Sequence, residues 1–233
     1  EPFISKKTKA IIIGYPANPT GTVMPREKLE DIVQLANRYG IIIISDEIYS
    51  RLVYECEHTC VATLPDAYEN TVFLGGFSKA YAMTGWRAGY AVGPSAIIAA
   101  MTKIHQYTIM SAPTMSQVAA IEALKSGEAS AAEMVADYNK RRLIILKGLC
   151  DIGLSCYKPQ GAFYVFPSIK NTGMTSEEFA HALLMEEKVA VVPGNAFGQY
   201  GEGYIRCCYA TSLKELYEAL ERMKRFLKRR GIS

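Results

Sequence analysis

Two short apolar segments separated by one amphipathic helix constrain the fold of this chain more than any other feature. Residues 10–14 are Ala-Ile-Ile-Ile-Gly, and residues 41–45 are Ile-Ile-Ile-Ile-Ser. Strands that are apolar on both faces are typical of parallel sheets covered by helices on both sides. Between the two segments, apolar residues recur at helical spacing and form one stripe: Leu29, Ile32, Val33 and Ala36. This order of strand, helix and strand predicts a βαβ unit with a right-handed crossover.

The remaining apolar patterns extend this fold and then change character. Further buried strands are expected at residues 71–74 and 88–92, and shorter alternating strands at 161–166, 189–192 and 204–209. Helices are expected at residues 93–107, 111–127, 129–149, 176–188 and 213–230. We therefore expect an α/β protein. Its three-layer α/β/α large domain, with a mostly parallel sheet, spans residues 1–129, and a smaller α+β domain spans residues 130–233.

Composition limits the classes of partner. A net charge of +3 over 233 residues argues for neither nucleic acid nor a membrane surface as a partner. The six cysteines do not form a disulfide framework and are typical of reduced thiols in a cytoplasmic protein. The segment from Cys56 to Cys60 lacks the second pair of ligands that a zinc site needs, so no metal site is expected.

One lysine lies in an unusual place. Lys79 follows the strand at 71–74 directly, within the glycine-rich and aromatic stretch of residues 75–89. Asn18 and Asp46 follow two other predicted strands. Ligands of open α/β sheets bind at the carboxyl ends of the strands, so we expect all three side chains to face one crevice. Alone, Asp46 would suit a cap of the following turn equally well, but its coincidence with Lys79 and Asn18 favours a binding site.

This set of groups suits pyridoxal 5'-phosphate, an aldehyde cofactor with a ring nitrogen. The cofactor needs a lysine for covalent attachment and a carboxylate that keeps its pyridine nitrogen protonated. Lys79 and Asp46 meet these two needs. Tyr49, together with Asn18, can hold the ring oxygen. The phosphate requires cations or hydroxyl groups, which Arg87 and Ser78 can supply.

Four segments, in their order and spacing, resemble the class I/II aminotransferases of the aspartate aminotransferase superfamily, which have fold type I. They are residues 18–21 (Asn-Pro-Thr-Gly), 45–49 (Ser-Asp-Glu-Ile-Tyr), 78–90 and 204–210. The resemblance covers essentially the whole chain. It implies transfer of an amino group between an L-amino acid and a 2-oxo acid through a Lys79 aldimine, in a cytoplasmic homodimer.

The resemblance also implies roles for individual residues. Asp46 pairs with the pyridinium, Asn18 and Tyr49 hold the ring oxygen, and Arg87 binds the phosphate. Arg206 grips the substrate α-carboxylate, with Asn18 close by. Without the resemblance, Arg206 would be interpreted as a strand residue in a surface ion pair. Tyr15 is expected to contribute to side-chain specificity.

The sequence departs from the family pattern in two respects. Gly76 stands where the family often has a phosphate-binding serine, and Ser78 is expected to replace it. The family's large domain also begins upstream of Glu1. We therefore expect this chain alone to be inactive and to bind the cofactor weakly or not at all. Two other functions fit the same motifs: a carbon–sulfur lyase of the same fold, and a non-catalytic aminotransferase-like sensor domain.

Overall fold

The computed structural model describes residues 1–232, which form two compact units. Unit 1 comprises Glu1–Pro16 and Val23–Glu133, and unit 2 comprises Ala17–Thr22 together with the residues from Met134 onward. The sequence pattern predicts a boundary between residues 129 and 130 and does not separate the short segment 17–22. The assignment of these units to a large and a small domain stays a prediction.

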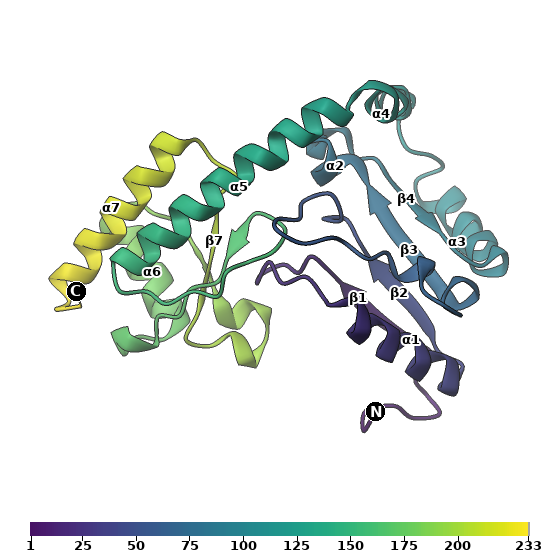
Figure 1. Cartoon of the computed structure of the whole chain (residues 1–233), viewed down its shortest axis with the longest axis horizontal. Helices are drawn as coiled ribbons and strands as arrows, with labels where there is room; N and C mark the ends of the chain where they lie inside the picture. Colours follow the sequence, from purple (N-terminus) through teal and green to yellow (C-terminus); the bar gives the residue numbers. More distant parts are fainter. Residues whose placement is uncertain (233) are drawn as a thin grey trace. The chain divides into compact units, whose positions relative to one another are not determined.

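Unit 1 is built on a four-stranded sheet. Its strands β1 (Ala10–Gly14), β2 (Ile42–Asp46), β3 (Thr71–Gly76) and β4 (Gly89–Val92) lie side by side in that order (Figure 1). The first three strands are parallel, and β4 runs antiparallel to β3. This mostly parallel sheet confirms the predicted α/β class.

Helix α1 (Arg26–Tyr39) covers part of this sheet because its apolar stripe is buried. Leu29, Val33 and Ala36 pack into one core cluster with Ile41 and Ile43. The helix ends at Gly40, which takes the left-handed conformation with φ of 62°. Glycine adopts this conformation without the steric cost that a side chain would bring.

The segment that carries Lys79 is folded back on itself. Strand β3 runs directly into the single-turn helix α2 (Phe77–Ala80), and the Phe77 amide donates to the carbonyl of Ala88 over 3.3 Å. Phe77, Met83 and Ala88 form a cluster with Ala120 of helix α4 (Thr114–Ser126). Helix α3 (Ser95–Thr108) lies between β4 and α4 in the chain.

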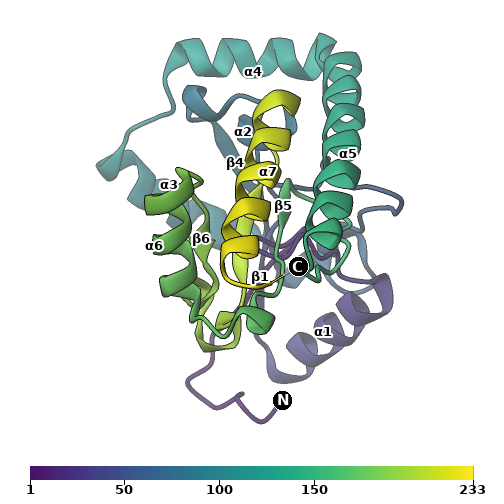
Figure 2. The same cartoon turned by 90° about the vertical axis from the view of Figure 1, so that its left-hand side faces the viewer.

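Unit 2 combines a small sheet with long helices. The strands β5 (Tyr164–Val165), β7 (Ile205–Cys208) and β6 (Val192–Pro193) are antiparallel in that spatial order. Helices α6 (Ser176–Glu187) and α7 (Leu213–Arg229) lie side by side (Figure 2), with the Phe179 and Phe226 rings 5.2 Å apart. Helix α5 (Glu128–Asp151) begins in unit 1 and continues into unit 2.

The strands of unit 2 are shorter than the alternating patterns predicted. Residues 161–166 yield only β5, because the amide of Gly161 bonds to the carbonyl of Gly21 instead of a neighbouring strand. Single-turn 3₁₀ helices occur at Val61–Thr63, Tyr68–Asn70, Thr84–Trp86, Lys170–Thr172, Gly194–Phe197 and Gln199–Gly201. None of the helices within residues 1–232 is long and apolar enough to cross a membrane.

Candidate active site

Lys79 lies at the point where β3 gives way to helix α2. The side chain is half-buried, and its Nζ atom is 6.0 Å from the centroid of the Tyr49 ring. Tyr49 itself is buried, with 7% of its surface exposed. Unit 1 therefore places an amine beside a phenol within a partly desolvated environment.

Asp46 is the last residue of β2 and is exposed. The strand register pairs Asp46 with Gly14 of β1 on one side and with Leu74 of β3 on the other. Its Oδ1 atom accepts a hydrogen bond of 3.2 Å from the amide of Ile48. Asp46 thus occupies the same edge of the sheet from which β3 leads to Lys79, as expected for the carboxyl ends of parallel strands.

Arg87 and Ser78 are linked through Thr84. The Arg87 backbone is left-handed, with φ of 54°, and its exposed guanidinium donates from Nη1 to the carbonyl of Thr84 over 2.9 Å. The hydroxyl of Thr84 donates in turn to the carbonyl of Ser78 over 3.0 Å. These contacts link Arg87 through Thr84 to helix α2, which carries Ser78 and Lys79.

The structure gives a physical reason for glycine at position 76. A Cβ atom there would lie 2.9 Å from Cδ1 of Ile48 and 3.2 Å from the Cα atom of Gly89. Both distances are shorter than ordinary van der Waals contacts, so a serine would require its neighbours to move.

Asn18 and Arg206 meet within unit 2. Arg206 Nη1 donates to Oδ1 of Asn18 over 2.8 Å, and its Cζ atom lies 4.5 Å from the Tyr164 ring centroid and 5.1 Å from that of Phe197. The Nε atom of Arg206 is buried and has no hydrogen-bond partner among the described residues. The partners of this guanidinium are an amide and two rings, which favours a binding group over a surface ion pair.

The turn that carries Asn18 is fixed by backbone hydrogen bonds. The amide of Gly21 donates to Ala17 over 2.7 Å, and the amides of Gln160 and Gly161 both donate to the carbonyl of Gly21 over 2.9 Å. Next to Gln160 in the chain, the carbonyl of Pro159 accepts a hydrogen bond of 2.7 Å from Nη1 of the buried Arg142. These contacts explain why residues 17–22 group with unit 2.

Comparison with protein families identifies the family to which the chain belongs. The family model "Aminotransferase class I and II" matches residues 2–223. The chain belongs to this aminotransferase family. This membership confirms the resemblance on which the sequence analysis relied.

Several proteins are closely similar to the chain. The YugH protein of Bacillus subtilis is 55% identical over 97% of the chain, and the aspartate aminotransferase of Pyrococcus abyssi is 45% identical over 99%. The crystal structure of an aromatic aminotransferase from Pyrococcus horikoshii matches all of the chain with a TM-score of 0.96 and 44% identity. The chain spans 59%, 60% and 63% of the lengths of these three proteins, respectively.

Aminotransferases of this family depend on pyridoxal 5'-phosphate, and four functional groups of unit 1 suit that cofactor. They comprise one amine, one exposed carboxylate, one buried phenol and one exposed guanidinium, from Lys79, Asp46, Tyr49 and Arg87. The amine can attach the cofactor covalently, and the carboxylate can pair with its ring nitrogen. The phenol can contact the ring oxygen, and the guanidinium can bind the phosphate. The orphaned Nε atom of Arg206 in unit 2 likewise suits a carboxylate ligand.

Tyr15 and Glu47 lie in environments that the sequence did not indicate. Tyr15, for which we expect a contribution to substrate specificity, is only 2% exposed and donates its hydroxyl to the carbonyl of Thr59, and its role in specificity stays a prediction. Glu47, which is not among the predicted site residues, is a buried carboxylate with 1% exposure. Position 47 has the same parity as Ile43 and Ser45 along the strand, and this signal could have predicted its burial.

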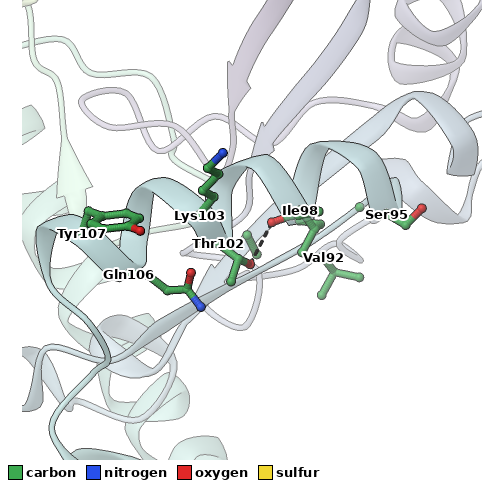
Figure 3. Close-up of a pocket in the computed structure, with 10 residues that line it drawn as sticks. Val92, Ser95, Ile98, Thr102, Lys103, Gln106 and Tyr107 are labelled. Carbon is green, nitrogen blue, oxygen red and sulfur yellow. Dashed lines mark hydrogen bonds between the residues drawn. The ribbon is translucent and has the colours of Figure 1, made fainter.

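A cavity of about 820 Å³ lies away from these residues, along β4 and α3 (Figure 3). Val92, Ile98, Lys103 and Tyr107 are among the residues that line it. None of the predicted site residues lines this cavity, so its size does not identify the aminotransferase site.

Proposed function

We propose that the protein is a pyridoxal-phosphate-dependent aminotransferase that moves an amino group between an L-amino acid and a 2-oxo acid. One observation carries the proposal. In unit 1, Lys79 follows strand β3 and Asp46 ends the neighbouring parallel strand β2, within the motifs of the family to which the chain belongs. An amine and a carboxylate in these positions suit an electron-sink cofactor.

The cofactor, when bound, supplies an electron-withdrawing ring that weakens the bonds at the α-carbon of an amino acid. Lys79 would hold the cofactor through its Nζ atom, and its amine would carry the proton to and from the α-carbon of the substrate. The carboxylate of Asp46 keeps a proton on the ring nitrogen. Arg87 and Ser78 bind the phosphate, and Tyr49 and Asn18 hold the ring oxygen.

Arg206 is the residue that we propose binds the substrate α-carboxylate. A guanidinium offers two parallel N–H donors to a carboxylate, a geometry that a lysine ammonium does not reproduce. The hydrogen bond to Asn18 and the rings of Tyr164 and Phe197 support this role, because they orient the plane of the guanidinium.

We also propose that units 1 and 2 correspond to part of the cofactor-binding large domain and to the small domain. The family's usual assembly supports a homodimer. Free thiols at Cys150, Cys156, Cys207 and Cys208 support a cytoplasmic location. Nothing in the structure or the comparisons favours the lyase or the sensor hypothesis.

Two measurements on the full-length protein test the function. Borohydride treatment in the presence of pyridoxal 5'-phosphate, followed by peptide mapping, should label Lys79; a label on another lysine contradicts the assignment. Formation of a 2-oxo acid from an amino acid should require an added acceptor 2-oxo acid. Its formation at the same rate without an acceptor would support a lyase instead.

A further inference from the structure

A buried polar cluster lies directly behind Asp46. Its centre is Glu47, whose side chain has 0% exposure, next to His58, whose side chain is 11% exposed. A carboxylate inside a protein is costly unless hydrogen bonds replace its lost hydration. Neither side chain has a role in the proposed reaction, and their burial requires an explanation.

Both oxygens of Glu47 have donors. Oε1 accepts from the hydroxyl of Ser45 over 2.8 Å and from the amide of Val61 over 3.1 Å, and Oε2 lies 2.5 Å from Nε2 of His58. The Nδ1 atom of His58 is buried without a hydrogen-bond partner in the described part of the chain. We assign the proton of His58 to Nε2, because a bare lone pair at Nδ1 costs less than an unpaired N–H group.

Tyr15 completes the cluster. Its ring stacks on that of His58 with centroids 5.1 Å apart, and its hydroxyl donates to the carbonyl of Thr59 over 2.7 Å. Burial, and secondly the charge of Glu47, raise the pKa of Tyr15, so the hydroxyl remains a donor. The cluster therefore connects residues 58–61, which lie in the segment between β2 and β3, to the end of β2.

The cluster is connected to Asp46 through the backbone, because Ser45 and Glu47 are its neighbours in the chain. Ser45 and Glu47, on either side of Asp46, point into the protein, whereas Asp46 is exposed, as the alternation along a strand requires. The amide of Tyr15 donates to the carbonyl of Asp46 over 3.2 Å, and the amide of Glu47 donates to Leu74 over 3.0 Å. The neighbours of Asp46 are thus held by side-chain and backbone hydrogen bonds together.

From these contacts we propose that Glu47 and His58 are positioning residues that fix the Asp46 carboxylate for the ring nitrogen of the cofactor. The proposal rests on the proposed function, because it assigns Asp46 to that nitrogen. Donation from Nε2 of His58 to Glu47 is the central contact, since it joins the loop to the strand end. The alternative is that the cluster only stabilises the fold.

Substitutions at Glu47 and His58 separate these two roles. Glu47→Gln keeps the shape of the side chain but removes its charge. Glu187→Gln is the matched control, because Glu187 is also a buried carboxylate but lies in unit 2, where it pairs with Arg225 and Arg229. At His58, Gln retains a donor near the position of Nε2, whereas Phe retains only a ring for stacking on Tyr15.

Hydrogen–deuterium exchange of the unliganded full-length protein, read by mass spectrometry, reports on Asp46 directly. The amides of Ile48 and Tyr15 donate to its side chain and its carbonyl. We expect Glu47→Gln and His58→Phe to accelerate exchange in the peptides that contain these amides at least tenfold. In Glu187→Gln and His58→Gln the same peptides should change less than threefold. Rates are compared after correction for each variant's unfolding midpoint.

Binding of pyridoxal 5'-phosphate is the second readout. We expect its dissociation constant to rise about tenfold in Glu47→Gln and His58→Phe and to change less than twofold in the two controls. The positioning role is overturned if the corrected exchange near Asp46 is unchanged in both Glu47→Gln and His58→Phe. If Glu47→Gln does not fold, the two His58 variants decide the matter. If the unsubstituted protein does not bind the cofactor, the proposed function fails, while the exchange data still report whether the cluster holds Asp46.

Discussion

Arg206 donates from Nη1 to the side-chain oxygen of Asn18 over 2.8 Å, although the two residues are 188 positions apart in the sequence. The contact fixes the guanidinium from one side, and the rings of Tyr164 and Phe197 lie within 4.5 and 5.1 Å of its Cζ atom. The buried Nε atom is left without a partner among the described residues. An oriented guanidinium with an unpaired donor is prepared for a carboxylate ligand.

Replacement of Arg206 by lysine should therefore impair substrate binding more than folding. We expect the KM values for the amino acid and for the 2-oxo acid to rise about 100-fold, because loss of a bidentate contact costs about 3 kcal/mol. Steady-state kinetics of the full-length enzyme measure this effect. Arg26→Lys, in an exposed ion pair with Glu30, is the control and should leave both KM values unchanged. Unchanged KM values in Arg206→Lys would exclude its role in carboxylate binding.

Lys79→Ala should remove activity and leave the fold intact. The lysine is half-buried, so we expect the unfolding midpoint to change by no more than about 3 °C. Loss of the proton carrier should lower the transamination rate by at least about 10³-fold, and added methylamine should restore part of it. Lys103→Ala, at the exposed lysine of the β4–α3 cavity, serves as the control and should retain the full rate. Substantial activity of Lys79→Ala without an added amine would contradict our assignment.

The features that the sequence predicted are local ones. The isoleucine-rich pattern of β2 specifies a strand of a parallel sheet, although only the alternate residues Ile43 and Ser45 are fully buried. The stripe of α1 specifies which helix face packs on the sheet. The assignment of Asp46 and Lys79 to a binding site followed from their positions at the ends of two predicted strands. Because side-chain direction and strand ends depend on short-range patterns, these elements could be predicted without any long-range contact.

Long-range contacts account for what the sequence did not reveal. The hydrogen bond between His58 and Glu47 depends on the path of an irregular loop, for which no periodic pattern exists. Segment 17–22 groups with unit 2 because the carbonyl of Gly21 accepts from Gln160 and Gly161, about 140 residues downstream. The role of Arg206 came from a family motif, and its contact with Asn18 required the structure.

The charge of Glu187 should make the stability of the protein depend on pH in the acidic range. Ion pairs with Arg229 and then with Arg225 hold the pKa of this carboxyl below its ordinary value of 4.5. A carboxyl whose pKa is lowered by folding stabilises the protein above its unfolded pKa, and the contribution is lost as the pH falls through the folded pKa. We expect the difference in unfolding midpoint between the native protein and Glu187→Gln to be largest near pH 7 and to shrink toward about pH 3.

Thermal unfolding at several pH values measures that difference. Glu30, whose partly exposed side chain forms an ion pair with Arg26, provides the control, and Glu30→Gln should change the midpoint little at any pH. A difference for Glu187→Gln that stayed constant from about pH 7 to about pH 3 would show that its charge is not responsible.

Gly21→Ala should disturb the turn that carries Asn18. Gly21 has φ of 67°, and a Cβ atom there would lie 2.4 Å from Cβ of Pro159 and 2.7 Å from the carbonyl oxygen of Gly161. Left-handed backbone strain and overlap together should cost on the order of 3 kcal/mol. Gly40→Ala is the matched control, because its φ is 62° with no atom within 4 Å of the new Cβ, and it should cost about 1 kcal/mol. Denaturant unfolding measures both costs. Because Asn18 orients Arg206, Gly21→Ala should also raise the substrate KM, whereas Gly40→Ala should not; equal effects of the two variants on stability and KM would contradict this account of the turn.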